Sequence, residues 1–184
     1  AARSGLWADF SPKPLSGQPG SGLHINLSVH GPDGSDPMPQ VLAGILQHAY
    51  DLTAFCNPCR DSYRRLGSSK APGYITWSSE NRSQLIRLPA AQGEYRRLEL
   101  RSPDPTANPY IAFALLIWAG LDGIVRDLPL PPIADLNLYE APAQVLASFR
   151  RLPATLEEAQ SAAAKSPFIR SHLPAAILSA YTQA

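Results

Sequence analysis

The sequence predicts an α+β fold in which an antiparallel sheet is packed by helices. Segments that alternate polar and apolar residues come first in the chain, and segments with helical periodicity dominate later. Strands and helices do not alternate regularly, as they would in a parallel βαβ arrangement. The chain has 184 residues, 45% of them hydrophobic, which is enough for one domain with its own core.

Short strands are expected at residues 7–13, 23–29, 74–77, 84–88 and 95–104. Residues 23–29 alternate most cleanly, because the odd positions are apolar whereas His24 and Asn26 occupy even positions. One face of this strand therefore belongs to the core, and the other belongs to a polar surface. Glycine- and proline-rich loops at 15–22 and 31–39 precede and follow it.

Two long helices are expected. Residues 40–55 carry apolar side chains at helical spacing and predict an amphipathic helix. Residues 108–125 are almost wholly apolar and contain no charge before Asp122, so we expect this second helix to be buried.

The last third of the chain has a different character. Prolines within residues 129–132 mark a rigid spacer, and the chain beyond it is rich in alanine. Thr155-Leu156-Glu157-Glu158 has the capping-box spacing of a helix start. We therefore divide the chain into a strand-rich region with helices, residues 1–126, and a proline spacer with a helical tail, residues 127–184.

Charge is unevenly distributed along the chain. The formal net charge is only +1, which argues against a general nucleic-acid or anionic-membrane partner. Residues 60–101, however, carry nine Lys or Arg against four Asp or Glu, which gives this segment a charge of +5. A local cationic patch suits a small anionic ligand. No apolar run approaches the roughly 18 residues that a membrane span needs.

The two cysteines form a lone pair, Cys56-Asn57-Pro58-Cys59. No second pair or nearby histidine completes four zinc ligands, although a redox role stays open. We interpret them as reduced cysteines at a helix end, as expected of a cytoplasmic protein. No signal peptide is visible, and the chain starts at Ala1, as a mature form or an excised fragment would.

The most informative motif is the alternating segment around Glu99. Arg97, Glu99 and Arg101 share one face of the expected strand, while Leu98 and Leu100 face the core. Guanidinium groups bind phosphate or carboxylate oxygens, and a carboxylate binds a hard divalent cation. The alternative is a solvated face of surface ion pairs, which would contribute little.

Other stretches add to this chemistry. The glycine-rich turn of residues 20–22 opens a strand with an inward His24, so backbone N–H groups could meet an anion there. His24 and Glu99 could then share a metal ion. Between them in the sequence, Arg82 precedes the strand expected at residues 84–88, and Arg87 lies within it.

In this order the stretches closely resemble the C-terminal half of the glutamine synthetase catalytic domain. The resemblance rests on GSGLH (20–24), ENRSQLIRLP (80–89), RRLELRSPDPTANPY (96–110) and AGLDGI (119–124). It extends from about Gly5 to Tyr139 and fades in the helical tail. The fold it implies is glutamine synthetase catalytic-domain-like, with only the C-terminal part present.

This resemblance implies an ATP-dependent ligase. ATP would phosphorylate the γ-carboxylate of glutamate, and ammonia would displace phosphate, with Mg²⁺ or Mn²⁺ neutralising the anions. The family works as homo-oligomeric rings whose active sites form between neighbouring subunits. Its N-terminal domain and most of its metal carboxylates precede the part seen here, so the resemblance implies that the isolated fragment is inactive.

The resemblance also implies roles for individual residues. His24 and Glu99 resemble ligands of the metal on the ATP side. The implied phosphate and nucleotide arginines are Arg82, Arg87 and Arg97. The implied substrate positions are Gly20, Arg65, which matches the arginine on the α-carboxylate, and Arg101, which meets the glutamate or its phosphoryl group. Arg82 and Arg101 are also the implied catalytic residues.

Three positions depart from the family pattern. Pro19 replaces a usual asparagine, and Asn26 replaces a usual second histidine. Lys70 stands where the family has the flap glutamate that takes a proton from ammonium. Ammonia, another amine acceptor, or a non-catalytic regulatory role therefore stay open. Tyr139 aligns with a tyrosine that some members adenylylate, and an ordinary loop tyrosine is the alternative.

Overall fold

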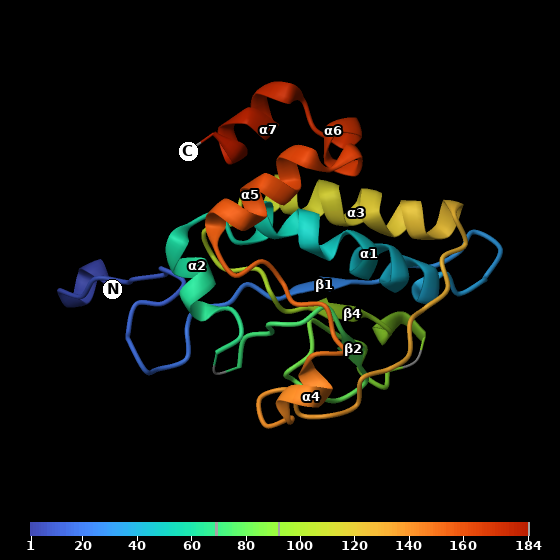
Figure 1. Cartoon of the computed structure of the whole chain (residues 1–184), viewed down its shortest axis with the longest axis horizontal. Coiled ribbons are helices and arrows are strands. Elements are labelled where there is room, and N and C mark those ends of the chain that lie inside the picture. The colour runs from blue at the N-terminus through green and yellow to red at the C-terminus, as the bar shows by residue number, and fades with distance from the viewer. Residues whose placement is uncertain (69, 92, 184) are drawn as a thin grey trace.

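The computed structural model describes residues 1–68, 70–91 and 93–183. Within them, a layer of helices covers one face of a small four-stranded sheet (Figure 1). The strands are β1 (Ile25–Leu27), β2 (Trp77–Ser78), β3 (Ile86–Arg87) and β4 (Leu98–Leu100), in the spatial order β1-β4-β3-β2. The predicted α+β fold is confirmed.

The sheet is mixed rather than wholly antiparallel. β4 pairs antiparallel with both β1 and β3, as predicted, but β2 and β3 run parallel. The connection between them explains the difference. The Asn81 backbone N–H donates to Ser78 Oγ at 2.9 Å, and the Ser83 N–H donates to Asn81 Oδ1 at 2.9 Å. These side-chain bonds hold the start of the connection in a tight turn, and β3 then pairs with β2 in the same direction.

The strands are shorter than the alternation predicts, and residues 7–13 form none. Trp7 and Phe10 are 92% and 68% exposed, and Figure 1 shows this segment running away from the sheet. A strand needs a neighbouring edge for its hydrogen bonds, which an alternating pattern alone does not supply. Tyr74, at the start of another expected strand, instead forms an isolated bridge with Arg151.

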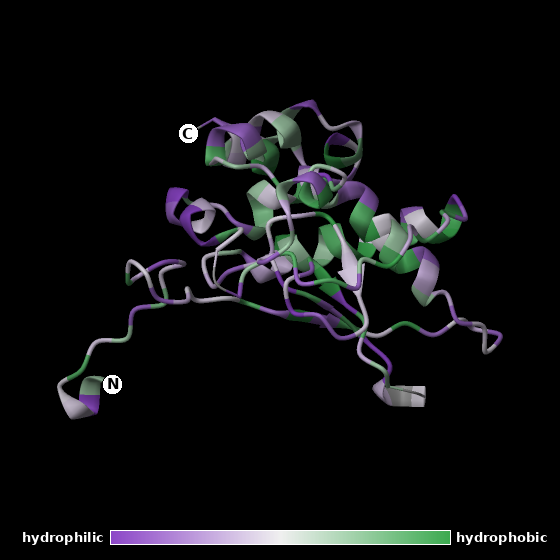
Figure 2. Cartoon of the chain, turned by 60° about the horizontal axis from the view of Figure 1, so that its bottom comes forward, coloured by the Kyte–Doolittle hydropathy of each residue, from purple (hydrophilic) through white to green (hydrophobic). Residues whose placement is uncertain are grey.

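Two long helices carry the core. α1 (Met38–Cys56) and α3 (Pro109–Val125) match the predicted segments to within two residues, and Asn108 caps α3 by accepting from the Tyr110 N–H. The helices approach closely at Gly44 of α1 and Gly123 of α3. A Cβ on Gly44 would lie 2.1 Å from the Ala119 carbonyl oxygen. Figure 2 shows hydrophobic residues concentrated on the helices above the sheet.

The prediction that the second long helix is buried is only half right. Ala112, Leu115 and Leu116 are buried against the core, but Ile117 and Trp118 are 55% and 46% exposed. The sequence is apolar around the whole circumference of α3, whereas the described residues cover only one side of it. Composition therefore could not reveal which face packs inward.

The helical tail packs on α1. The remaining helices are α2 (Arg60–Arg65), α4 (Ala143–Leu146), α5 (Leu156–Lys165), α6 (Pro167–His172) and α7 (Ala175–Thr182), with 3₁₀ turns at Ala2–Ser4 and Gly93–Tyr95. The helix start predicted at Thr155 is confirmed, because its side chain accepts from the Glu158 N–H. None of the described helices is both long and apolar enough to cross a membrane.

We expect Gly44→Ala to destabilise the protein by about 2–3 kcal/mol, because the added methyl group collides with the α3 backbone. The matched control is Gln47→Ala, at an exposed position of the same helix, which should change stability by less than about 0.5 kcal/mol. Urea unfolding followed by circular dichroism measures both. Equal stability of the two variants would show that the helices are not in close contact at Gly44.

Candidate active site

A cavity of about 520 Å³ lies on the face of the sheet opposite the helical layer. The alternation in β4 produces this arrangement, because Leu98 and Leu100 are buried in the core while Glu99 points to the other side. The cavity is lined by Pro19, Gly20, Gly22, His24, Arg65, Lys70, Ala71, Arg82, Arg87, Glu99 and Arg101.

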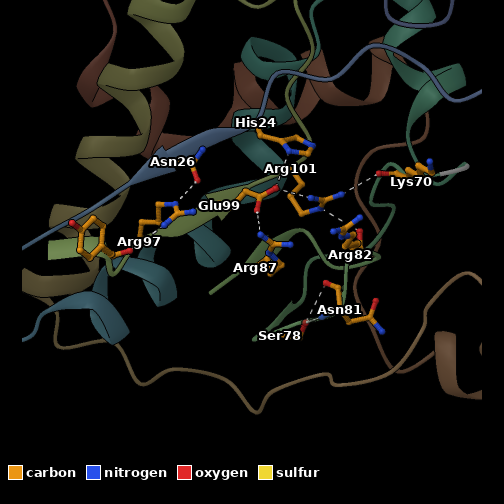
Figure 3. Close-up of polar contacts among 11 residues, drawn as sticks. His24, Asn26, Lys70, Ser78, Asn81, Arg82, Arg87, Arg97, Glu99 and Arg101 are labelled. Carbon is orange, nitrogen blue, oxygen red and sulfur yellow. Dashed lines mark hydrogen bonds and ion pairs between the residues drawn. The ribbon is translucent and has the colours of Figure 1, made fainter. Parts of the chain in front are cut away.

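Glu99 is the centre of this cavity (Figure 3). Its carboxylate is only 7% exposed and contacts three side chains. Oε1 lies 2.8 Å from His24 Nδ1 and 2.6 Å from Arg101 Nη1, and Oε2 lies 2.9 Å from Arg87 Nη2. These partners come from β3 and from the segments flanking β1 and β4, so one carboxylate joins three parts of the sheet. Its charge is offset by two guanidinium groups.

His24 is held in the neutral form. Burial and the neighbouring Arg101 lower the pKa of its imidazole, although the Glu99 carboxylate opposes this shift. A carboxylate only accepts hydrogen bonds, so Nδ1 carries the proton that faces Glu99 and Nε2 keeps its lone pair. A neutral imidazole with a free Nε2 is the form that binds a metal ion.

Arg65 is fixed beneath the glycine-rich turn. Its guanidinium is buried and donates to the carbonyl oxygens of Ser102, at 2.7 Å, and Arg101, at 3.2 Å. A Cβ on Gly22 would lie 2.6 Å from Arg65 Nη2, so only glycine allows the turn to approach so closely. The sequence placed Gly20 and Arg65 in one site, and the structure brings them to one cavity.

Arg101 organises the loop side of the cavity. Besides Glu99, it donates from Nε to the Arg82 carbonyl oxygen at 3.2 Å and from Nη2 to the Lys70 carbonyl oxygen at 3.4 Å. Arg87 differs, because its buried Nε has no hydrogen-bond partner among the described residues. An unpaired buried guanidinium donor is costly unless an anion satisfies it, so Arg87 is ready to accept one.

Seven of the eight site residues predicted from the sequence lie at this cavity, and Arg97 does not. Arg97 shares the face of Glu99 but reaches outward, donating to Asn26 Oδ1 at 3.3 Å and to the Tyr95 carbonyl oxygen at 3.1 Å. Period-two alternation fixes the face of a side chain but not its distance from the cavity. The predicted burial of Ile25, Leu98 and Leu100 on the opposite face is confirmed, whereas Leu27, predicted with them, is only half-buried.

The sequence did not single out the buried pair that supports the arginines. Asn57 and Asp104 are both fully buried, and Asn57 Nδ2 donates to the Ser102 carbonyl oxygen at 2.8 Å and to Asp104 Oδ2 at 3.0 Å. Together they brace the backbone that follows Arg101. The cysteines flanking Asn57 are free, and burial raises the pKa of Cys56 to about 12, so it remains a thiol.

His24 and Glu99, the predicted metal ligands, meet in the cavity. Among the residues that the structure describes, no group of three or more His, Cys, Asp or Glu side chains gathers around one point. A divalent cation such as Mg²⁺ takes about six ligands, mostly oxygens, so these two side chains could supply only a minority of them, and His24 would have to present Nε2 in place of the Nδ1–H that faces Glu99. With five cationic side chains around one carboxylate, the cavity is suited above all to a multiply charged anion.

Comparison with known proteins shows the family to which this domain belongs. The sequence model described as "Glutamine synthetase, catalytic domain" matches residues 1–184, and the chain belongs to this family. The match includes the helical tail, where the motifs quoted above fade, so the resemblance extends further than the motifs predicted.

Similar proteins confirm this assignment. The chain is 40% identical to glutamine synthetase of Thermus thermophilus over 199 residues, which cover all of this chain and 45% of the relative. It is 39% identical to glutamine synthetase of Methanosarcina mazei, covering 98% of this chain and 44% of the relative. The chain therefore spans less than half the length of these relatives.

Two solved structures share the fold. The "GmaS/ADP complex-Conformation 1" has a TM-score of 0.84 at 33% identity, covering 99% of this chain and 45% of that chain. "Apo GmaS without ligand" has a TM-score of 0.82 at 34% identity, and the match covers 100% of this chain and 44% of that chain.

The metal-free protein offers a direct test of the cavity electrostatics. We expect His24 to titrate below the ordinary histidine pKa of about 6.5, and Glu99→Gln to lower its pKa further, because this change removes the neighbouring anion. Glu157→Gln, which removes an exposed carboxylate paired with Arg60, is the matched control and should leave His24 unchanged. Imidazole NMR signals followed against pH measure each value. A higher pKa in Glu99→Gln would contradict this geometry.

Proposed function

We propose that the protein containing this chain is an ATP-dependent carbon–nitrogen ligase that acts on glutamate. The observation that carries this proposal is that Glu99 is the one carboxylate among the described residues lining the cavity and that arginines surround it. Transfer of a phosphoryl group to a carboxylate brings several negative charges together, and such a cavity neutralises them. Relatives named glutamine synthetase and a related structure described as an ADP complex support the proposal.

The arginines take different parts in this reaction. Arg87, with its unpaired Nε, and Arg82, which is exposed at the cavity, contact the phosphates of ATP. Arg97 lies farther out on the same face and contacts the nucleotide. Arg101 is held by three acceptors and meets the γ-phosphoryl group in transfer. Arg82 and Arg101 thereby stabilise the transition state, in which charge spreads over the phosphoryl oxygens.

The glutamate substrate binds beside the glycine-rich turn. Arg65 holds the edge of the cavity below this turn and attracts the α-carboxylate, and the backbone at Gly20 contacts the substrate. The γ-carboxylate then attacks the terminal phosphorus of ATP, and ADP leaves. An amine attacks the resulting acyl phosphate in the second step.

A divalent cation, Mg²⁺ or Mn²⁺, would be held by Glu99 and His24, with the imidazole turned so that Nε2 rather than Nδ1–H faces the carboxylate. When bound, it neutralises charge on the phosphates. The remaining ligands come from the phosphates and from parts of the longer protein outside these 184 residues, which also implies that the isolated chain is inactive. We propose that the longer protein is a cytoplasmic homo-oligomeric ring in nitrogen metabolism.

The acceptor is ammonia or another amine, and the charges of the cavity disfavour an acceptor whose only charged group is an ammonium. Lys70 lines the cavity, and its carbonyl oxygen binds Arg101. No acidic side chain other than Glu99 lines the cavity among the described residues. An ammonium ion therefore finds repulsion where it would need a carboxylate.

Hydroxylamine traps an acyl phosphate whatever the natural acceptor is, so it tests the proposed first step. With ATP and glutamate, the longer protein should form γ-glutamyl hydroxamate. Arg87→Gln should lower kcat/KM by about 10²- to 10³-fold, because it removes a phosphate donor. Arg96→Gln is the matched control, since Arg96 pairs with Asp36 on the surface, and it should change the rate less than about twofold. Hydroxamate formation that does not depend on ATP would contradict the proposal.

A further inference from the structure

A second cavity, of about 550 Å³, adjoins the first. Lys70 lines both cavities, and Ser83 of the second follows Arg82 of the first in the chain. Tyr139 also lines the second cavity. Burial raises the pKa of its hydroxyl, and the charges of Arg101 and Arg65 from the first cavity oppose this rise. A molecule in the second cavity can therefore extend one end toward the groups proposed to bind the acyl phosphate.

The wall of the second cavity is firmly built. The Ile75 N–H donates to the Arg150 carbonyl oxygen at 2.8 Å, and the Leu152 N–H donates to the Gly73 carbonyl oxygen at 3.0 Å. These bonds flank the bridge between Tyr74 and Arg151, whose guanidinium lies 5.4 Å from the Tyr74 ring centroid. The arginine is thus held at the cavity by backbone pairing and by a cation–π contact.

The opposite wall comes from the segment after the proline spacer. The Leu138 N–H donates to Ser83 Oγ at 2.9 Å, and Gln84 Nε2 donates to the Leu136 carbonyl oxygen at 2.8 Å. Leu138 and Tyr139 are thereby fixed beside the sheet. The apolar surfaces of Leu138, Tyr139 and Tyr74 line the cavity, and a short carbon chain can pack against them.

The charges in this cavity have one sign. Lys70 and Arg151 are cationic, and none of the described lining residues is acidic. Such a lining attracts a carboxylate and repels a second ammonium group. It also lowers the pKa of a bound ammonium ion, which favours the neutral amine that acts as the nucleophile.

We propose that the second cavity binds the acceptor of the ligase and that this acceptor is an amine bearing a carboxylate, as in an amino acid. The carboxylate lies at Arg151, and the amino group passes Lys70 into the first cavity. The nitrogen lone pair attacks the γ-carbonyl carbon of the acyl phosphate and forms the C–N bond. The C–O bond to phosphate breaks, phosphate leaves with the electron pair, and the amine releases one proton to water. This inference rests on the proposed ligase function.

Matched acceptors test the proposal in the longer protein. Glycine, β-alanine and γ-aminobutyrate are compared with ethylamine, propylamine and butylamine, with putrescine and ammonia included. At least one amino acid should exceed its matched alkylamine by about tenfold in kcat/KM, because Arg151 faces its carboxylate. Equal use of the amino acids and the alkylamines, or a preference for putrescine or ammonia, would overturn the inference.

Adjacent arginines provide the variants. Arg151→Gln should lower the ratio of kcat/KM for the preferred amino acid to that for hydroxylamine about fivefold, through a higher KM for the amino acid. Arg150→Gln is the control, because Arg150 lies 4.3 Å over the Tyr50 ring and does not line the cavity, and it should keep the ratio. Arg151→Lys, which retains the charge, should keep most of the preference.

The hydroxylamine assay distinguishes failure of the acceptor inference from failure of the proposed ligase function. If hydroxamate forms but the amino acids show no advantage, or if Arg151→Gln keeps the ratio, the acceptor inference is wrong and the ligase function stands. If no hydroxamate forms with ATP and glutamate, the proposed function itself fails, and the acceptor inference fails with it.

Discussion

The cavity depends on one buried carboxylate. Glu99 is 7% exposed, and a charge so far removed from water is tolerated only with close ionic partners. Arg87, Arg101 and His24 provide these contacts, and each comes from a different segment of the sheet region. The arginines in turn need a carboxylate to remain together, because their charges repel one another. Anion-binding groups are therefore held in place before any ligand arrives.

This cluster rests on the packing behind it. Glu99 faces the cavity because Leu98 and Leu100 are buried in the core, and a slip of one residue would bury the carboxylate there instead. The core is closed by α1 and α3, which meet at Gly44 and Gly123 with almost no space between their backbones. Burial of the two leucines in the core beneath these helices thus favours the observed register of β4, the strand that carries Glu99.

The sequence correctly predicted on which face of the strand each side chain near Glu99 lies, but not how far each one lies from the cavity. Alternation around Glu99 placed the leucines in the core and the charges outside, since the side-chain period of a strand is fixed by its backbone. It could not show that Arg97 reaches toward Asn26, away from the cavity. The exposed side of α3 was likewise hidden, because an all-apolar helix gives no sign of which face has a partner.

Long-range pairing was the other feature that the sequence did not reveal. The wall of the second cavity joins residues 73–75 to residues 150–152, and no local pattern connects segments so far apart. The parallel pairing of β2 and β3 is likewise accompanied by hydrogen bonds that Ser78 Oγ and Asn81 Oδ1 accept from the backbone between the two strands. Such features follow from tertiary contacts rather than from periodicity.

Binding of ATP to the longer protein, measured by calorimetry with and without Mg²⁺, tests most directly whether Glu99 acts as a metal ligand within a cationic cavity. Glu99→Gln removes a negative charge from the cavity and also removes a cation ligand. The account predicts that this variant binds metal-free ATP more tightly and Mg²⁺-loaded ATP more weakly, each by about tenfold. A change in the same direction under both conditions would contradict it, because Glu99 would then serve only to hold the arginines.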